Sequence, residues 1–265
     1  MHFITVTAEQ NDAIATLLHC FNECTAQHQH IALALAVIYK PIESHALLRV
    51  LEQLDLPELN TVNAKELKHF IAELCELELV QKSRHGFIIN RLIANSLVKR
   101  CLAKNLYVAL LTAAEKVAPV LSSYQWEDNT ADKRRLLRDM YFLGEHKRVT
   151  ELLNLPKNPM MLDWQQTPAL CSVVFYPFNL DEFAALDTRL QYQAFATLIA
   201  AHRNKGHSTA QLLHWLHQAC DTLPENTWLH YLKAEQYLLS GELSKLEHAL
   251  DNQDTSTYSL LLQAC

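Results

Sequence analysis

Glycine is scarce in this sequence, and its scarcity limits the architectures that the chain can adopt. Only four glycines occur among 265 residues, at Gly86, Gly144, Gly206 and Gly241. A strand-rich fold with many tight turns needs more residues that tolerate positive φ. Leucine and alanine are abundant and favour helices. We therefore predict a mainly helical, all-α fold.

Long apolar segments are missing as well. The most apolar stretch, residues 31–39, is too short to cross a bilayer, and residues 1–10 lack the apolar run of a secretory leader. The seven cysteines are odd in number and show no spacing typical of a disulfide framework. We expect a cytoplasmic protein with reduced thiols and no membrane partner.

The common local motifs of catalysis and cofactor binding do not occur. The four glycines lie far apart in the sequence, so no P-loop or GxGxxG motif is available to surround a phosphate. HExxH, GxSxG and paired CxxC motifs are missing too. We expect that the chain is not an enzyme and that it binds no cofactor.

Two groupings of histidine and cysteine share helical spacing and could hold a soft metal ion. One comprises His214, His217 and Cys220, and the other comprises Cys20, Cys24 and His28. Leucines, a tryptophan and a phenylalanine surround both groupings, which favours a buried amphipathic stripe over a ligand set. Structural zinc sites also use tighter spacing. We therefore predict no metal site.

The first hundred residues contain helix signals followed by a short hairpin. Thr7 with Gln10 and Asn63 with Glu66 each have the spacing of a capping box. Helices are predicted after Thr7, at about 29–39, at about 44–54, and after Asn63, where Leu67, Phe70, Ile71, Leu74 and Leu77 would be buried. Residues 79–82 and 87–89 then flank a turn that contains Gly86, which predicts a β-hairpin.

In a winged-helix domain, helices are followed by a two-stranded hairpin, and this sequence predicts the same order. The segment ELELVQKSRHGFIINRLIANSLVKR, residues 76–100, resembles the end of such domains, where a wing leads into a further helix. It looks like the winged-helix modules of large signalling ATPases, which precede helical repeats. The resemblance covers roughly residues 28–102 and implies a regulatory module.

Helical signals fill the remainder, and some of them recur. An aromatic helix reaches a glycine turn at Gly144 and again at Gly241, and an amphipathic segment follows each turn. A further hairpin is predicted from residues 189–204 and 208–221 around Gly206. The spacing of Ala234, Tyr237 and Gly241 is similar to that of a degenerate tetratricopeptide repeat, whose helix pairs stack into a solenoid.

These patterns predict three regions. Residues 1–104 form a winged-helix-like module with a leading helix, residues 105–183 a helical connector with a basic region, and residues 184–265 tetratricopeptide-like hairpins. The sequence ends inside an apolar helical pattern, so we expect it to be the N-terminal part of a longer protein. The four tryptophans, Trp228 among them, are interpreted as packing residues.

Charge is distributed unevenly along the chain. Residues 82–156 carry 13 basic and 7 acidic residues, a net +6, whereas the chain as a whole has a net charge of −6. The candidate contacts to phosphate or to an acidic partner are Lys82, Arg84 and His85 in the wing and Lys133, Arg134, Arg135 and Arg138 on a later helix. The alternative for the later cluster is a solvated face paired locally with Asp132 and Asp139.

Two functions are compatible with these features. The predicted recognition helix carries Lys65, Lys68 and His69 but also three carboxylates, Glu66, Glu73 and Glu76, which would repel phosphate. We therefore favour a regulatory region that binds a protein partner or another domain of its own longer chain. The alternative is a nucleic-acid-associated accessory region attached to a downstream ATPase such as a helicase or remodeller. A contiguous exposed basic patch would favour the alternative.

Overall fold

The computed structural model describes residues 8–119, 130–153 and 169–246, and these residues are mainly helical. They form two compact units, an N-terminal unit of residues 7–139 and a C-terminal unit whose described residues run from 140 to 246. Residues 105–183, predicted as one connector, contribute to both units. Within the described parts, no helix combines the length and apolar character that a membrane span requires.

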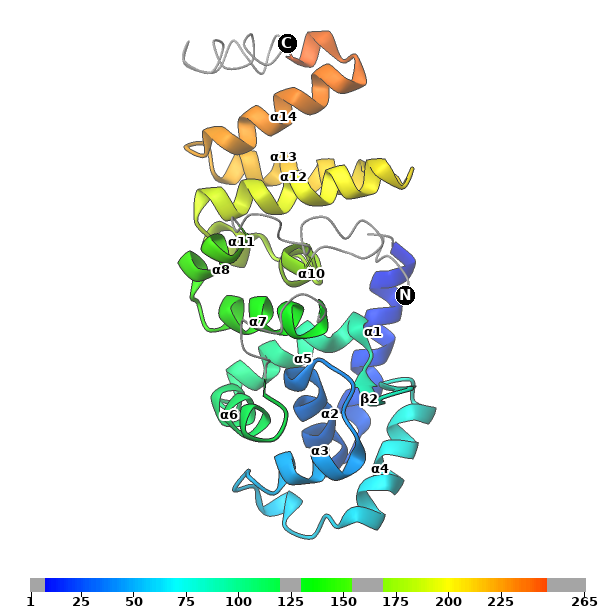
Figure 1. Cartoon of the computed structure of the whole chain (residues 1–265). Coiled ribbons are helices and arrows are strands. Elements are labelled where there is room, and N and C mark those ends of the chain that lie inside the picture. The colour runs from blue at the N-terminus through cyan, green and yellow to red at the C-terminus, as the bar shows by residue number, and fades with distance from the viewer. Residues whose placement is uncertain (1–7, 120–129, 154–168, 247–265) are drawn as a thin grey trace. The chain divides into compact units, whose positions relative to one another are not determined.

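The N-terminal unit surrounds one central helix. Its elements are α1 (Ala8–Glu23), α2 (Ala26–Ile38), α3 (Ser44–Leu51), the 3₁₀ turn η1 (Pro57–Leu59), α4 (Ala64–Glu76), β1 (Val80–Ser83), β2 (Gly86–Ile89), α5 (Arg91–Ala103), α6 (Tyr107–Val117) and most of α7 (Thr130–Phe142) (Figure 1). Residues 31–38 of α2 are all buried, because α3, α4, α5, α6 and β2 pack around this helix. A helix that is apolar on every side is expected at the centre of a helical unit.

The hairpin is held to the start of α3 by a bridge to Ile42. Strands β1 and β2 pair antiparallel, with Val80 opposite Ile89 and Ser83 opposite Gly86. Ile42, which lies between α2 and α3, exchanges two backbone hydrogen bonds with Phe87 at 2.9 and 3.0 Å. Gly86 has a φ of +120°, and a Cβ atom there would collide with the backbone of Ile42. Only glycine allows the hairpin to approach the chain this closely.

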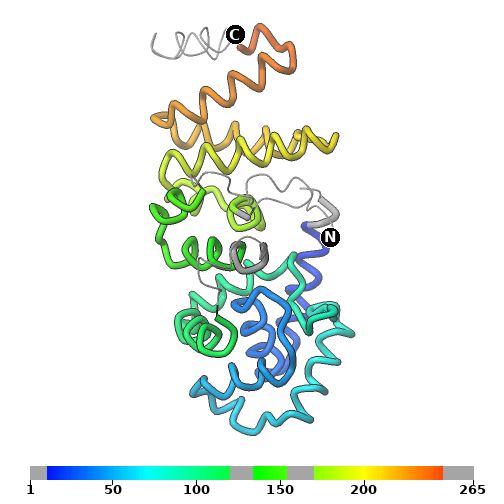
Figure 2. The backbone as a smooth tube through the Cα atoms, viewed as in Figure 1, coloured from blue at the N-terminus to red at the C-terminus, as the bar shows by residue number. Residues whose placement is uncertain are grey.

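The C-terminal unit consists of helices that lie across one another. They are the end of α7, α8 (His146–Leu153), α10 (Ala169–Phe175), α11 (Leu180–Ala184), α12 (Thr188–Asn204), α13 (Ala210–Thr222) and α14 (Thr227–Ser240). Helix α14 packs against both α12 and α13, and α12 also contacts α8 and α10; Figure 2 traces the chain through these helices. The core between α10, α12 and α13 is aromatic: Phe175 and Phe178 both stack on Trp215.

Three helices of the C-terminal unit end in the same way. Gly144, Gly206 and Gly241 have φ values of +74°, +67° and +74°. At each, the glycine N–H bonds the carbonyl three residues earlier, and the next N–H bonds the carbonyl five residues before it. This is the Schellman arrangement, in which glycine takes the left-handed position after the helix. A second helical segment follows each turn, and after Gly241 the description ends at residue 246 within it.

Several predictions from the sequence are confirmed. The fold is mainly helical, the hairpin forms, and Asn63 and Glu66 form a capping box at the start of α4. The sequence predicted Gly86 in the turn, but it is the first residue of β2. Leu67, Ile71 and Leu74 of α4 are buried as expected, whereas Phe70 is half-buried, and Leu77 is 41% exposed because α4 ends at Glu76. The capping box predicted at Thr7 lies outside the described residues.

Candidate functional site

The predicted wing, which is the hairpin of β1 and β2, presents its three basic residues to solvent. Lys82, Arg84 and His85 are all exposed on the hairpin formed by β1 and β2. Ser83 fixes the turn between them: its hydroxyl donates to the carbonyl of Gly86 at 3.0 Å and accepts from the N–H of His85 at 3.2 Å. These three predicted contact residues therefore do lie together on one small exposed element.

Helix α4 beside the wing has its own mixture of charges. Lys65, Lys68 and His69 are exposed, as a recognition helix would require. Glu66 accepts the backbone N–H of Asn63 at 3.1 Å in the capping box, and Glu73 bonds His28 of α2 at 2.5 Å and His69 at 3.3 Å. Two of the three carboxylates expected to repel phosphate are therefore occupied by contacts within the unit.

The second predicted cluster, on α7, is not an exposed patch. Arg134, Arg135 and Arg138 are 8%, 0% and 1% exposed. Lys133 lies on the same helix, but its side chain is outside the described residues. Both interpretations of the sequence placed these arginines at the surface, and this is wrong, because the guanidinium of Arg135 bonds residues of α6 and its C-terminal end and that of Arg138 bonds α2 and α5. The local pairing with Asp139 that the alternative predicted is confirmed for Arg135.

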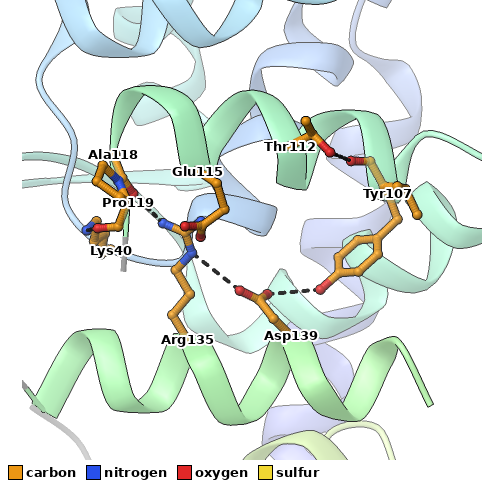
Figure 3. Close-up of polar contacts among 9 residues, drawn as sticks. Lys40, Tyr107, Thr112, Glu115, Ala118, Pro119, Arg135 and Asp139 are labelled. Carbon is orange, nitrogen blue, oxygen red and sulfur yellow. Dashed lines mark hydrogen bonds and ion pairs between the residues drawn. The ribbon is translucent and has the colours of Figure 1, made fainter. Parts of the chain in front are cut away.

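Arg135 belongs to a buried polar network between α7 and α6. It donates to the carbonyl of Ala118 at 2.7 Å and forms ion pairs with Glu115 and with Asp139, the latter at 3.4 Å. The hydroxyl of Tyr107 donates to the other oxygen of Asp139 at 2.9 Å. Figure 3 shows Arg135, Asp139 and Tyr107 aligned between the two helices. Asp139 therefore holds a guanidinium and a phenol in one network.

Burial changes the proton affinity of this network. It raises the pKa of Asp139 to about 6, although the neighbouring charges of Arg135 and Arg138 oppose the change. Burial and the nearby Asp139 carboxylate also raise the pKa of Tyr107, so this phenol stays protonated and remains a donor. A carboxyl with a raised pKa can mark a catalytic acid. Here its bonds run to side chains that fasten helices together, so a structural role accounts for it.

Arg138 joins α7 to α2 and α5 through a second set of buried hydrogen bonds. Its guanidinium donates to Oδ1 of Asn95 at 2.9 Å and to the carbonyls of Ala36 and Ala94 at 2.6 and 3.0 Å. The group also lies 4.1 Å from the ring centroid of Tyr39, a cation–π contact. Burial lowers the pKa of Arg138. A side chain with this many internal partners is not available to bind phosphate.

The two histidine–cysteine groupings have other partners. His28 bonds the hydroxyl of Thr25 at 2.7 Å in addition to Glu73, and His217 bonds the hydroxyl of Tyr237 at 3.2 Å. Cys220 is buried, and burial raises the pKa of its thiol to about 12, which disfavours the thiolate that metals bind. No group of three such ligands could hold a metal ion in the parts of the chain that the structure describes.

Sequence reasoning missed an exposed aromatic surface on the C-terminal unit. Trp228 was expected to pack in a repeat core, but it is 54% exposed. Its ring lies 5.6 Å from that of Tyr192, which comes from α12. The periodicity contained no signal for this exposure, because Trp228 and the buried Leu232 are four residues apart and share one face of α14. Trp215 is half-buried and packs on Phe175 and Phe178, and Trp126 and Trp164 lie outside the described residues.

Comparisons with known proteins found none that is similar to this chain. No protein-family model matches the sequence, and no match was found among curated proteins or solved structures. The interpretation of the wing and of the aromatic surface therefore depends on their geometry alone.

Proposed function

We propose that this chain is a non-catalytic, regulatory protein-interaction region. In this proposal the N-terminal unit is a winged-helix-like module, and the C-terminal unit consists of degenerate tetratricopeptide-like hairpins. The order α2, Ile42, α3, α4, β1, β2 supports the first assignment, since a single strand position between the first two helices pairs with the wing. Three glycine turns of one geometry support the second assignment.

The observation that carries the proposed function is the pair formed by the exposed Trp228 and the half-buried Tyr192. Tryptophan and tyrosine are enriched in protein interfaces because their rings offer a large contact area with little loss of entropy. Helices α12 and α14 are neighbours, while α13 packs against both of them. In stacked helix pairs, a surface formed by successive first helices of the pairs is where partners bind.

The test is a quantitative comparison of proteins that co-purify with three forms of the tagged chain from its own cells, after nuclease treatment. A partner should be retained by the parent and by Gln218→Ala, which changes an exposed residue of α13, and lost from Trp228→Ala. Loss from neither variant, or equal loss from both, would count against the α12–α14 surface. Circular dichroism would confirm that both variants are folded.

The alternative function, a nucleic-acid-associated accessory region, has support from the wing. Lys82, Arg84 and His85 are exposed together, and Glu66 and Glu73 are already bonded within the N-terminal unit. The interior position of Arg135 and Arg138 counts against it, because phosphate contact dominates affinity for nucleic acid and these two cations are not offered to a ligand. We therefore place protein interaction first.

A further inference from the structure

Four side chains form what we call the aromatic–acidic patch: Tyr192 on α12, and Trp228, Tyr231 and Glu235 on α14. Trp228, Tyr231 and Glu235 have the i, i+3, i+7 spacing of residues that share one face of a helix. Tyr192 joins this face from the neighbouring helix, with its ring inclined by 50° to that of Trp228. Tyr192, Tyr231 and Glu235 are half-buried, and Trp228 is exposed.

Glu235 shares the face of α14 that carries Trp228 and Tyr231. Burial raises the pKa of Tyr192, and the charges of Glu235 and Tyr231 raise it further. Among the described residues, Glu235 forms no ion pair, whereas Glu145 pairs with Arg148 and Glu242 pairs with Lys245.

The nearest lysine on α14 lies on a different face. The charge of Lys233 contributes to the lowered pKa of His217, a residue of α13, after the larger effect of burial. It also contributes to the lowered pKa of His230. Lys233 and Glu235 are two residues apart on α14, so they lie on different faces of this helix.

We propose that the aromatic–acidic patch binds a lysine or arginine side chain presented by a basic segment of a partner protein. Ring faces carry negative electrostatic potential, and a half-buried carboxylate beside them adds to the attraction for a cation. An arginine is also a frequent anchor of protein interfaces. This inference depends on the proposed interaction function and specifies the chemistry of the partner.

The charge of the surrounding sequence agrees with this choice of partner. The described residues of the C-terminal unit, 140–153 and 169–246, carry 7 basic and 9 acidic residues, a net −2. A net negative charge favours the approach of a basic segment over that of an acidic one. The same charge would repel an acidic peptide or a nucleic acid.

The experiment is a fluorescence-anisotropy titration of the full chain with a short labelled peptide in which lysine and arginine alternate with glycine and serine. A second peptide, with glutamine in place of every basic residue, serves as the ligand control. Three variants are compared with the parent: Trp228→Ala, Glu235→Gln and Asp221→Asn. Asp221 is an exposed carboxylate on α13, so its variant removes the same charge as Glu235→Gln away from the patch.

We expect the basic peptide to bind the parent, and Trp228→Ala and Glu235→Gln to weaken binding by about tenfold each. Asp221→Asn should change it by less than about twofold, as an exposed charge does. Equal weakening by Asp221→Asn and Glu235→Gln would overturn the inference in favour of diffuse charge attraction. Equal binding of the glutamine peptide, or no binding of either peptide, would overturn it as well.

The two experiments distinguish a failure of this inference from a failure of the proposed function. If co-purification depends on Trp228 but the basic peptide does not bind, protein interaction stands and the cationic ligand is rejected. If Trp228→Ala were to unfold, its circular dichroism spectrum would show this, and Glu235→Gln with its matched control would still decide the outcome.

Discussion

The Nε–H of Arg138 on α7 donates to Oδ1 of Asn95 on α5 over 2.9 Å, inside the N-terminal unit. Asn95 is 4% exposed and Arg138 is 1% exposed, so the bond is shielded from solvent. The same guanidinium reaches the carbonyl of Ala36 in α2. One side chain therefore joins α7, α5 and the central helix.

We expect Arg138→Ala to be among the most damaging single substitutions in the N-terminal unit. It would leave the acceptors of Ala36, Ala94 and Asn95 without this donor in a buried site. The expected loss in the free energy of unfolding is about 3 to 5 kcal/mol, measured by urea denaturation. Arg84→Ala, which removes an exposed arginine of the wing, should cost less than about 0.5 kcal/mol. Equal losses would show that Arg138 is not held in the interior.

Asp139 should give the unfolding free energy a recognisable pH dependence. Its pKa is raised by burial to about 6 in the folded chain, whereas the unfolded value is about 4. The folded state therefore binds this proton more tightly, and the resulting stability is complete below about pH 4 and lost as pH rises to about 6.

The measurement is urea unfolding of the parent and of Asp139→Asn from pH 4 to 6. The parent's stability relative to this variant should fall across the window by up to about 3 kcal/mol, the conversion of the pKa difference. Asp55→Asn, an exposed change in the same unit, is the control and should follow the parent. A difference that grows with rising pH would contradict the assignment.

Gly86 should resist substitution for two reasons that can be separated. Its positive φ alone costs any residue with a Cβ about 1 to 2 kcal/mol. Gly206→Ala isolates this cost, because the Cβ would enter open space at a φ of +67°. Gly86→Ala adds a collision with the Ile42 backbone, so its loss should exceed that of Gly206→Ala in thermal or urea unfolding. Equal losses would mean that the hairpin does not lie against Ile42.

Nucleic-acid binding should be weak and should not depend on α7. At about 150 mM salt we expect no micromolar binding of duplex or single-stranded DNA by the full chain, measured by fluorescence anisotropy. The variant that tests the alternative function replaces Lys82, Arg84 and His85 with alanine, since these residues are exposed. Salt-sensitive binding that this variant abolishes would instead establish the wing as a phosphate contact. Replacing Arg135 or Arg138 would disturb folding and would not distinguish the two functions.

The sequence predicted the helices and the hairpin because their signals are local. A capping box at Asn63, a glycine between two apolar runs and the repeated glycine turns each act through a few neighbouring residues. The burial of Arg138 depends on carbonyls of Ala36 and Ala94, which are distant in sequence and become acceptors only when α7 packs against α2 and α5.

The exposed aromatic surface was missed for a related reason. Trp228 has the spacing of a repeat core, and only the packing of α14 against α12 and α13 determines which of its faces stays open. Apolar character alone predicts burial. A tryptophan can be buried in the core of its own chain or in an interface with a partner, and its apolar character does not distinguish the two. The pairing of Trp228 with Tyr192 needs α12 and α14 in place.

Photo-crosslinking at position 228 tests the central claim most directly. A benzophenone amino acid would replace Trp228 in one sample and Gln218 on α13 in a matched control, both expressed in the cells that make this protein. The expected result is a discrete protein adduct at position 228 that depends on light, is stronger than any adduct at 218 and weakens with Glu235→Gln. No adduct at 228, or the same adducts at both positions, would contradict a protein-binding surface between α12 and α14.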